Sequence, residues 1–248
     1  MGVTKLGMLT PSSNTCLEPL TQEMVSGLPD LSVHYSRVPV VTIGLSAQET
    51  VQFEIDTMVA SARLLADAEV DVIAWNGTAG SWLGLDHDRA IASAITEATG
   101  VPATTSTLAF FDAFAALGTK RYGLAVPYTL DVTQQIMSVY REEGLECVAE
   151  AHLDIRVNTE IGAVPGERIA ELLRQVAVPG ADALAVVCTN FWGGRVAPSV
   201  ERERGIPVLD SVAVTLWHSL LLAGHSTAAL QPWGQIFGLQ TLPAARER

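Results

Sequence analysis

The chain has few basic residues, and lysine is almost absent from it. Of its 248 residues, 15 are Lys or Arg and 27 are Asp or Glu, which gives a formal net charge of −12. The only lysines are Lys5 and Lys120, and both directly precede expected strands. An acidic chain is a poor partner for a phosphate backbone, so we expect no nucleic-acid partner. The scarcity of lysine also argues against Schiff-base chemistry.

Cysteine is scarce as well. Cys16, Cys147 and Cys188 are too few and too scattered for a disulfide framework, and no pair has CxxC spacing. Reduced thiols in a cytoplasmic protein are therefore expected. No apolar run approaches the ~18 residues of a membrane span, so we expect no membrane partner.

Sequence motifs for cofactors are missing too. There is no GxxxxGK[ST], and no GxGxxG follows an expected strand. The run Asp86-His87-Asp88 resembles a metal site, but three adjacent residues at a helix start cannot converge on one ion. We expect solvated charge there, and neither a metal nor any other cofactor.

Short apolar runs bounded by Gly, Pro or Asp alternate with helical patterns. The runs predict eight buried strands, near residues 5–10, 32–36, 71–75, 102–105, 121–126, 146–151, 183–187 and 206–209. Apolar residues recur at helical spacing over 51–65, 129–143 and 169–176. This alternation predicts an α/β fold, in which helices cover parallel sheets.

An internal repeat divides the chain. Three segments recur in the same order: 5–12 resembles 121–128, 71–78 resembles 182–189, and 100–102 resembles 205–207. Three matches in register predict two similar α/β halves.

The repeat predicts where the halves begin and where they bind a ligand. We place the first half at 1–115, completed by the C-terminal segment 216–248, and the second at 116–215. Ligands of parallel sheets bind beyond the carboxyl ends of the strands, and clefts between domains are preferred sites. The active site is therefore expected in the cleft between the halves.

Cys188 is the main candidate for chemistry. It ends the apolar run 183–187, where a strand turns into a loop. Backbone N–H groups at such a place are expected to lower the thiol pKa from its free value of ~8.5, which would let the thiol exchange protons near neutrality. The alternative is that Cys188 is a small buried hydrophobe. Cys16 is a weaker candidate, and Cys147 is expected to be inert.

Gly77 is the counterpart of Cys188 in the repeat. Thiols at both positions would flank one carbon atom, and Gly77 removes one of them. A single proton donor suits a reaction that forms a carbanion by loss of CO2 and protonates it on one face. Gly77→Cys is then expected to add racemase activity, provided that the two positions face each other. Alternatively, Gly77 supplies a positive φ after the strand.

Neutral hydrogen-bond donors gather at the same rim. Asn14, Thr78, Tyr128 and Thr189 all follow expected strands. Such donors can hold a carboxylate and stabilise an enediolate, although each could equally cap a helix. Asn158, in a long loop of the second half, could close over a ligand or cap a turn.

Several motifs closely resemble maleate cis-trans isomerases. They are PSSNT at 11–15, PYTLDV at 127–132, NTEIGAVPGE at 158–167 and the lone Cys188, within a match over about 3–225. The resemblance implies a place in the aspartate/glutamate/hydantoin racemase superfamily, with two flavodoxin-like halves related by pseudo-two-fold symmetry. It also implies that Asn14, Tyr128 and Asn158 bind substrate carboxylates and that Cys188 is catalytic.

One departure resembles the arylmalonate decarboxylases instead. The isomerases carry a nucleophilic cysteine where this chain has Gly77. The decarboxylases have GTS at that place, and this chain has Gly77-Thr78-Ala79. This resemblance implies that Thr78 and Tyr128 hold the retained carboxylate in a dioxyanion hole, while Cys188 protonates the enediolate.

The leading prediction is a cofactor-independent enzyme that acts on a small dicarboxylate or substituted malonate, as a decarboxylase. Cys188 is the predicted catalytic residue, and the predicted substrate-binding residues are Asn14, Gly77, Thr78, Tyr128, Asn158 and Thr189. Two alternatives stay open: a maleate cis-trans isomerase or racemase-type isomerase, and a non-catalytic dicarboxylate-binding protein. Apolar helices such as 212–223 leave a homo-oligomer possible.

Overall fold

The computed structural model describes residues 2–46 and 54–243, and their eight strands form two four-stranded parallel sheets. The first sheet has the order β2 (Leu31–Val38), β1 (Thr4–Pro11), β3 (Val72–Trp75), β4 (Ala103–Thr105). The second has the order β6 (Glu146–Ala151), β5 (Arg121–Ala125), β7 (Ala183–Val186), β8 (Val208–Asp210). The eight predicted strands are confirmed, and the two sheets have the same strand order.

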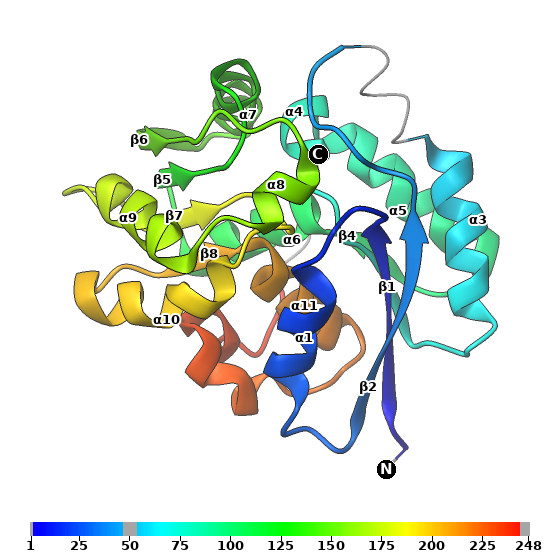
Figure 1. The fold of residues 1–248 in the computed structure, drawn as a ribbon. Helices are drawn as coiled ribbons and strands as arrows, with labels where there is room; N and C mark the ends of the chain where they lie inside the picture. Colours follow the sequence, from blue (N-terminus) through cyan, green and yellow to red (C-terminus); the bar gives the residue numbers. More distant parts are fainter. Residues whose placement is uncertain (1, 47–53, 244–248) are drawn as a thin grey trace.

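Helices connect the strands and cover the sheets (Figure 1). Those that accompany the first sheet are α1 (Leu17–Val25), α3 (Ile55–Ala66), α4 (Gly80–Leu83), α5 (Leu85–Thr99) and α6 (Ser106–Leu117). The later elements are α7 (Leu130–Glu142), α8 (Asn158–Gly162), α9 (Gly166–Val176), α10 (Gly193–Arg204), α11 (Ser211–Leu222), η2 (Ala228–Trp233) and η3 (Gln235–Gly238). The predicted helical segments correspond to α3, α7 and α9; Val51, part of the first pattern, lies outside the described residues.

The repeat is visible in matching hydrogen bonds as well as in strand order. Asp71 directly precedes β3, and its Oδ2 accepts a hydrogen bond from the backbone N–H of Lys5 at the start of β1 (2.7 Å). Asp182 directly precedes β7, and its Oδ2 accepts the equivalent bond from the N–H of Arg121 at the start of β5 (2.8 Å). The same side chain therefore fixes the start of the same pair of strands in both halves.

Two equivalent helices pack against each other between the sheets. α6 follows β4 and α11 follows β8, and both are apolar and largely buried. Figure 1 shows them at the centre of the molecule. Oγ1 of Thr215 in α11 donates to Oγ of Ser106 in α6 (2.8 Å). The halves are thus held together by a buried helix pair, which also fixes how the strand ends of the two sheets face each other.

The predicted division of the chain stays a prediction. The C-terminal turns contact elements beside both sheets, since η2 packs on α10 and α1, and η3 packs on α11 and β8. Within 2–46 and 54–243, no helix combines the length and the apolar character that crossing a membrane requires.

Candidate active site

A small cavity lies where the carboxyl ends of strands from both sheets meet. All seven residues that we predicted as catalytic or substrate-binding line it: Asn14, Gly77, Thr78, Tyr128, Asn158, Cys188 and Thr189. The other lining residues are Pro11, Val40, Ile43, Ala79, Trp82 and Asn190. The volume of the cavity is about 20 Å³, which is room for roughly one water molecule. No Asp, Glu, Lys, Arg or His is among these described lining residues.

Two long loops, one from each half, pair beside this cavity. Thr42, after β2, and Val157, before α8, form an isolated antiparallel bridge. The N–H of Ile43 also donates to the carbonyl oxygen of Arg156 (3.1 Å). This pairing holds Ile43 and Asn158, which line the cavity, next to each other.

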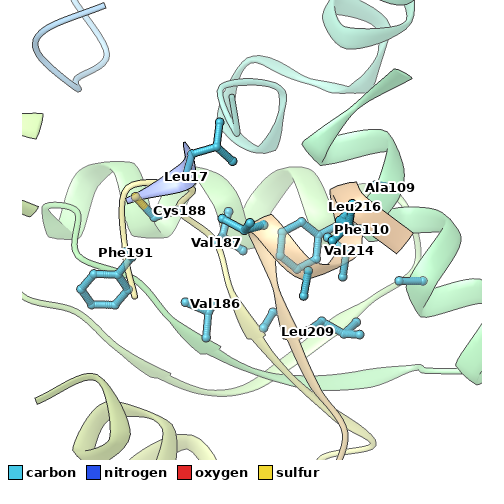
Figure 2. Packing of buried hydrophobic residues seen from close by; sticks show 14 of the residues in the cluster. Leu17, Ala109, Phe110, Val186, Val187, Cys188, Phe191, Leu209, Val214 and Leu216 are labelled. Carbon is cyan, nitrogen blue, oxygen red and sulfur yellow. The ribbon is translucent and has the colours of Figure 1, made fainter. Parts of the chain in front are cut away.

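Cys188 lies two residues after β7 and is held by a serine from the next strand-to-helix turn. Its backbone N–H donates to Oγ of Ser211 (2.8 Å), and this hydroxyl donates in turn to the carbonyl oxygen of Val186 (2.9 Å). Figure 2 shows Val186, Val187 and Cys188 in succession along the chain, with Phe191 beyond the turn. Cys188 is 3 % exposed, yet it lines the cavity. Ser211 was not predicted as the residue that fixes this turn.

The expected lowering of the Cys188 pKa was wrong. Burial, and to a lesser extent the charge of Asp210, raise the pKa of this thiol to about 12. Hydrogen bonds from the Tyr128 hydroxyl and the backbone N–H of Asn190 lower the pKa, but less than burial raises it. The site therefore holds Cys188 as a protonated thiol at neutral pH.

Tyr128 connects Cys188 to the opposite half. Its hydroxyl oxygen lies 3.0 Å from Oγ1 of Thr78 and hydrogen-bonds the Cys188 sulfur. Its ring packs edge-on against Trp82, with centroids 5.4 Å apart. Thr78, Tyr128 and Cys188 thus form a buried row of hydroxyl, hydroxyl and thiol across the two halves.

Asn14 caps a helix and contacts the second half at the same time. Its Oδ1 accepts hydrogen bonds from the backbone N–H groups of Cys16 and Leu17 (2.9 Å each), at the start of α1. Its Nδ2 donates to Oγ1 of Thr189 (3.1 Å), which itself donates to the carbonyl oxygen of Asn76 (2.9 Å). The capping alternative is therefore correct for Asn14, and one amide hydrogen remains for a ligand.

Asn158 and Asn190 extend this polar network. Nδ2 of Asn158 donates to Oγ of Ser13 (2.8 Å), and Nδ2 of Asn190 donates to the carbonyl oxygen of Asn158. Oδ1 of Asn190 accepts a hydrogen bond from the N–H of Thr15 (2.9 Å). Asn190 was not predicted, although its position directly after Thr189 in the repeat was a usable signal.

Gly77 faces a tryptophan rather than open space. A Cβ at this position would lie 2.6 Å from Nε1 of Trp75 and closer still to two ring carbons. Real Cβ contacts below 3.0 Å essentially do not occur. The alternative reading, a positive φ, is wrong, since Gly77 is not among the glycines with positive φ. The expectation for Gly77→Cys needs the same correction: a thiol does not fit while Trp75 keeps its position.

Cys16 lies beside the cavity and not in its wall. It is fully buried at the start of α1, and its Sγ donates to the carbonyl oxygen of Gly162 (3.7 Å). Burial, and to a lesser extent the nearby Cys188, raise its pKa to about 12. Cys16 is therefore a protonated thiol, like Cys188, but it has no place among the cavity-lining residues.

Two carboxyl groups are buried near the cavity, and the sequence did not predict either. Asp88, which was expected to be solvated, is fully buried. Oγ1 of Thr105 donates a hydrogen bond to its Oδ2 (2.6 Å). Burial raises its pKa to about 6. Asp210 caps α11 through the N–H groups of Val212 and Ala213, and burial raises its pKa to about 7.

A metal site is not evident in the part of the chain that the structure describes. Within those residues, no three or more His, Cys, Asp or Glu side chains are grouped so that they could hold a metal ion.

The chain is similar to two kinds of characterised enzyme. A family model described as arylmalonate decarboxylase matches residues 26–237. The chain is 29 % identical to arylmalonate decarboxylase from Bordetella bronchiseptica (82 % of this chain and 88 % of the relative), and 27 % identical to maleate isomerase from Nocardia farcinica (85 % and 86 %).

A solved structure confirms the fold. It is a mutant of the Nocardia farcinica maleate cis-trans isomerase with a covalently bound succinylcysteine intermediate. It superposes with a TM-score of 0.86 over 95 % of this chain and 98 % of that chain, at 23 % identity. The family model covers most of the chain. The chain is therefore an enzyme that belongs to the arylmalonate decarboxylase family.

Proposed function

We propose that this enzyme decarboxylates a small malonate-type diacid and protonates the resulting enediolate with Cys188. The observation that carries the proposal is the pairing of one protonated thiol on one side of the cavity with Gly77 on the other. Among the described residues that line the cavity, Cys188 is the only cysteine.

The hydroxyl groups of Thr78 and Tyr128 suit the carboxylate that the product retains. They lie 3.0 Å apart, so both can donate to one carboxylate. When the carbon–carbon bond to the leaving carboxylate breaks, CO2 departs and its bonding electrons move onto the retained carboxylate as an enediolate. Fixed donors in a water-poor site stabilise such developing charge strongly.

The protonated state of Cys188 fits the second step. Its S–H bond breaks as the α-carbon gains a proton, which leaves an acid product and a thiolate. The backbone N–H of Asn190, which already hydrogen-bonds the sulfur, stabilises this thiolate until solvent returns a proton, while the single O–H of Tyr128 stays on the carboxylate. The thiol thus has a proton to give and a backbone donor to stabilise the charge that remains.

Maleate isomerisation is the second candidate, because Asn14 and Asn158 add amide groups that could hold a second, permanent carboxylate. The Nocardia farcinica enzyme forms a succinylcysteine intermediate, which requires a sulfur nucleophile. Because burial raises the pKa of Cys188 to about 12, the thiol and not the thiolate predominates at neutral pH. The state of Cys188 therefore favours proton donation over nucleophilic addition.

A direct substrate test separates the two reactions. The purified protein is incubated with phenylmalonate, methylmalonate or maleate, and CO2 release and fumarate formation are followed. The proposal expects CO2 from a malonate and no fumarate from maleate. Fumarate without CO2 release would make the chain an isomerase, and a ligand-induced rise in melting temperature with no product from any of the three would instead indicate a binding protein.

A further inference from the structure

Trp75 occupies the space that a side chain at position 77 would need. The indole lies at the carboxyl end of β3, is fully buried, and would meet a Cβ on Gly77 at less than any normal contact distance. A close-packed interior leaves a buried indole little room to move aside. Trp75 therefore excludes any residue larger than glycine at position 77.

The second half of the chain provides an internal comparison. By the repeat, Trp75 corresponds to Val186 and Gly77 corresponds to Cys188. Both Trp75 and Val186 are the last residues of their strands, β3 and β7. A valine in this position is followed by a cysteine that reaches the cavity, whereas a tryptophan is followed by a glycine. A small residue at the end of the strand is thus accompanied by a side chain two positions later, and a large one is accompanied by none.

The indole also lacks the chemistry of a thiol. Its N–H donates hydrogen bonds but does not take up a proton, whereas a thiolate does. Nε1 of Trp75 has no hydrogen-bond partner within the described ranges. The residue that fills the space beside Gly77 therefore cannot serve as an acid or a base.

We propose that Trp75 is a specificity-determining residue, which restricts proton transfer to the Cys188 side of the substrate. This inference rests on the proposed function. It implies that the enzyme becomes a racemase only when the indole is removed and a thiol is added at 77. One thiolate would then take the α-proton as the C–H bond breaks, and the opposite thiol would give its proton to the other face, with no net change in charge or oxidation state.

The steric part is tested by melting temperatures of Gly77→Cys, Trp75→Val and the double variant. Gly77→Cys alone should melt several degrees below the wild type. Trp75→Val should also melt lower because it leaves a cavity. The double variant should melt at a higher temperature than the sum of the two single-variant shifts predicts, because the new side chain enters the space left by the indole. Trp75→Leu with Gly77→Cys replaces the double variant if the valine version does not fold.

A second fully buried tryptophan, in another element, provides the control. Trp217 in α11 is also fully buried, so Trp217→Val combined with Gly77→Cys should show additive shifts. The inference would be overturned if Gly77→Cys melted at the wild-type temperature. It would also be overturned if the shifts of Trp75→Val and Gly77→Cys were additive in the double variant.

The chemical part is tested with one enantiomer of 2-phenylpropionate in D2O. The folded double variant should racemise it with deuterium at the α-carbon, and neither the wild type nor Gly77→Cys should do so. A folded double variant that does not racemise the acid would overturn the chemical claim. Wild-type CO2 release from phenylmalonate is measured in parallel. If this release is absent while the melting temperatures remain coupled, the proposed function fails and the steric role of Trp75 stands.

Discussion

The hydroxyl oxygen of Tyr128 lies 3.0 Å from Oγ1 of Thr78, and the two residues follow strands of different sheets. Thr78 follows β3 of the first sheet, and Tyr128 follows β5 of the second. Tyr128 also hydrogen-bonds the Cys188 sulfur. The proposed carboxylate site therefore exists only when the two halves are in register, and the buried contact between α6 and α11 maintains that register.

Tyr128→Phe should lower kcat for decarboxylation by ~10²–10³-fold, the usual effect of losing one donor to developing negative charge. The phenyl ring keeps the packing against Trp82, so the fold should persist. Steady-state kinetics with phenylmalonate measure the effect. Tyr140→Phe is the matched control, since Tyr140 is equally buried but hydrogen-bonds Ser81 (3.0 Å) away from the cavity wall. It should lose about 1 kcal/mol of stability and keep its kcat; equal kcat losses in both variants would contradict the assigned role.

Alkylation should report the high pKa of Cys188. Because only the thiolate reacts, modification by iodoacetamide should be slow at pH 7 and increase with pH up to at least pH 10. Burial raises the pKa of Cys188 to about 12 and that of half-buried Cys147 to about 11, so Cys147 is the internal reference. Mass spectrometry of the modified peptides at each pH gives both rates. Fast modification of Cys188 that levels off near pH 8 would show a low pKa and favour the nucleophilic reaction.

Most of the fold could be predicted from the sequence because its signals are local. Buried parallel strands appear as short apolar runs, and the repeat added the correspondence of equivalent residues, such as Lys5 with Arg121 and Asp71 with Asp182. The lining of the cavity followed from the same rule, since residues after parallel strands share one edge of a sheet.

What the sequence could not predict depends on packing in three dimensions. The pKa of Cys188 was placed on the wrong side of its free value because burial outweighs the two hydrogen bonds to its sulfur. The contact between Trp75 and Gly77 depends on how the indole packs, and strand patterns do not contain that information. Asp88 was expected in solvent, whereas it is buried in α5 and accepts a hydrogen bond from Thr105 at the end of β4.

Asn14→Ala should destabilise the fold. The substitution removes the acceptor for the N–H groups of Cys16 and Leu17 and the donor to Thr189. Loss of a helix cap costs ~1 kcal/mol, and the lost contact with the second half adds to this. Urea unfolding should show a lower midpoint with an unchanged m-value. Ser26→Ala, at an exposed position after α1, is the control and should unfold like the wild type; an unchanged midpoint for Asn14→Ala would contradict the capping role.

Asp210 should make stability depend on pH. Its pKa is about 7 in the folded protein, against an ordinary value of 3.8. Below about pH 4 the carboxyl is protonated in both states; between about pH 4 and 7 the unfolded state ionises first, so folding loses stability as pH rises. Asp210→Asn retains the acceptor for Val212 and Ala213 and removes this loss.

The measurement is the free energy of unfolding of wild type and Asp210→Asn from pH 4 to 8. The stability of the wild type relative to Asp210→Asn should fall as pH rises. A difference that stays constant, or that changes in the opposite direction, would mean that Asp210 is ionised in the folded protein.

The most direct test is the rate of CO2 release from phenylmalonate by Cys188→Ala, with Cys147→Ala as the matched thiol control. Loss of the proton donor should reduce turnover by ~10²–10⁴-fold, while the ligand still raises the melting temperature and Cys147→Ala retains wild-type turnover. Full turnover by Cys188→Ala would contradict the claim that this single thiol protonates the enediolate.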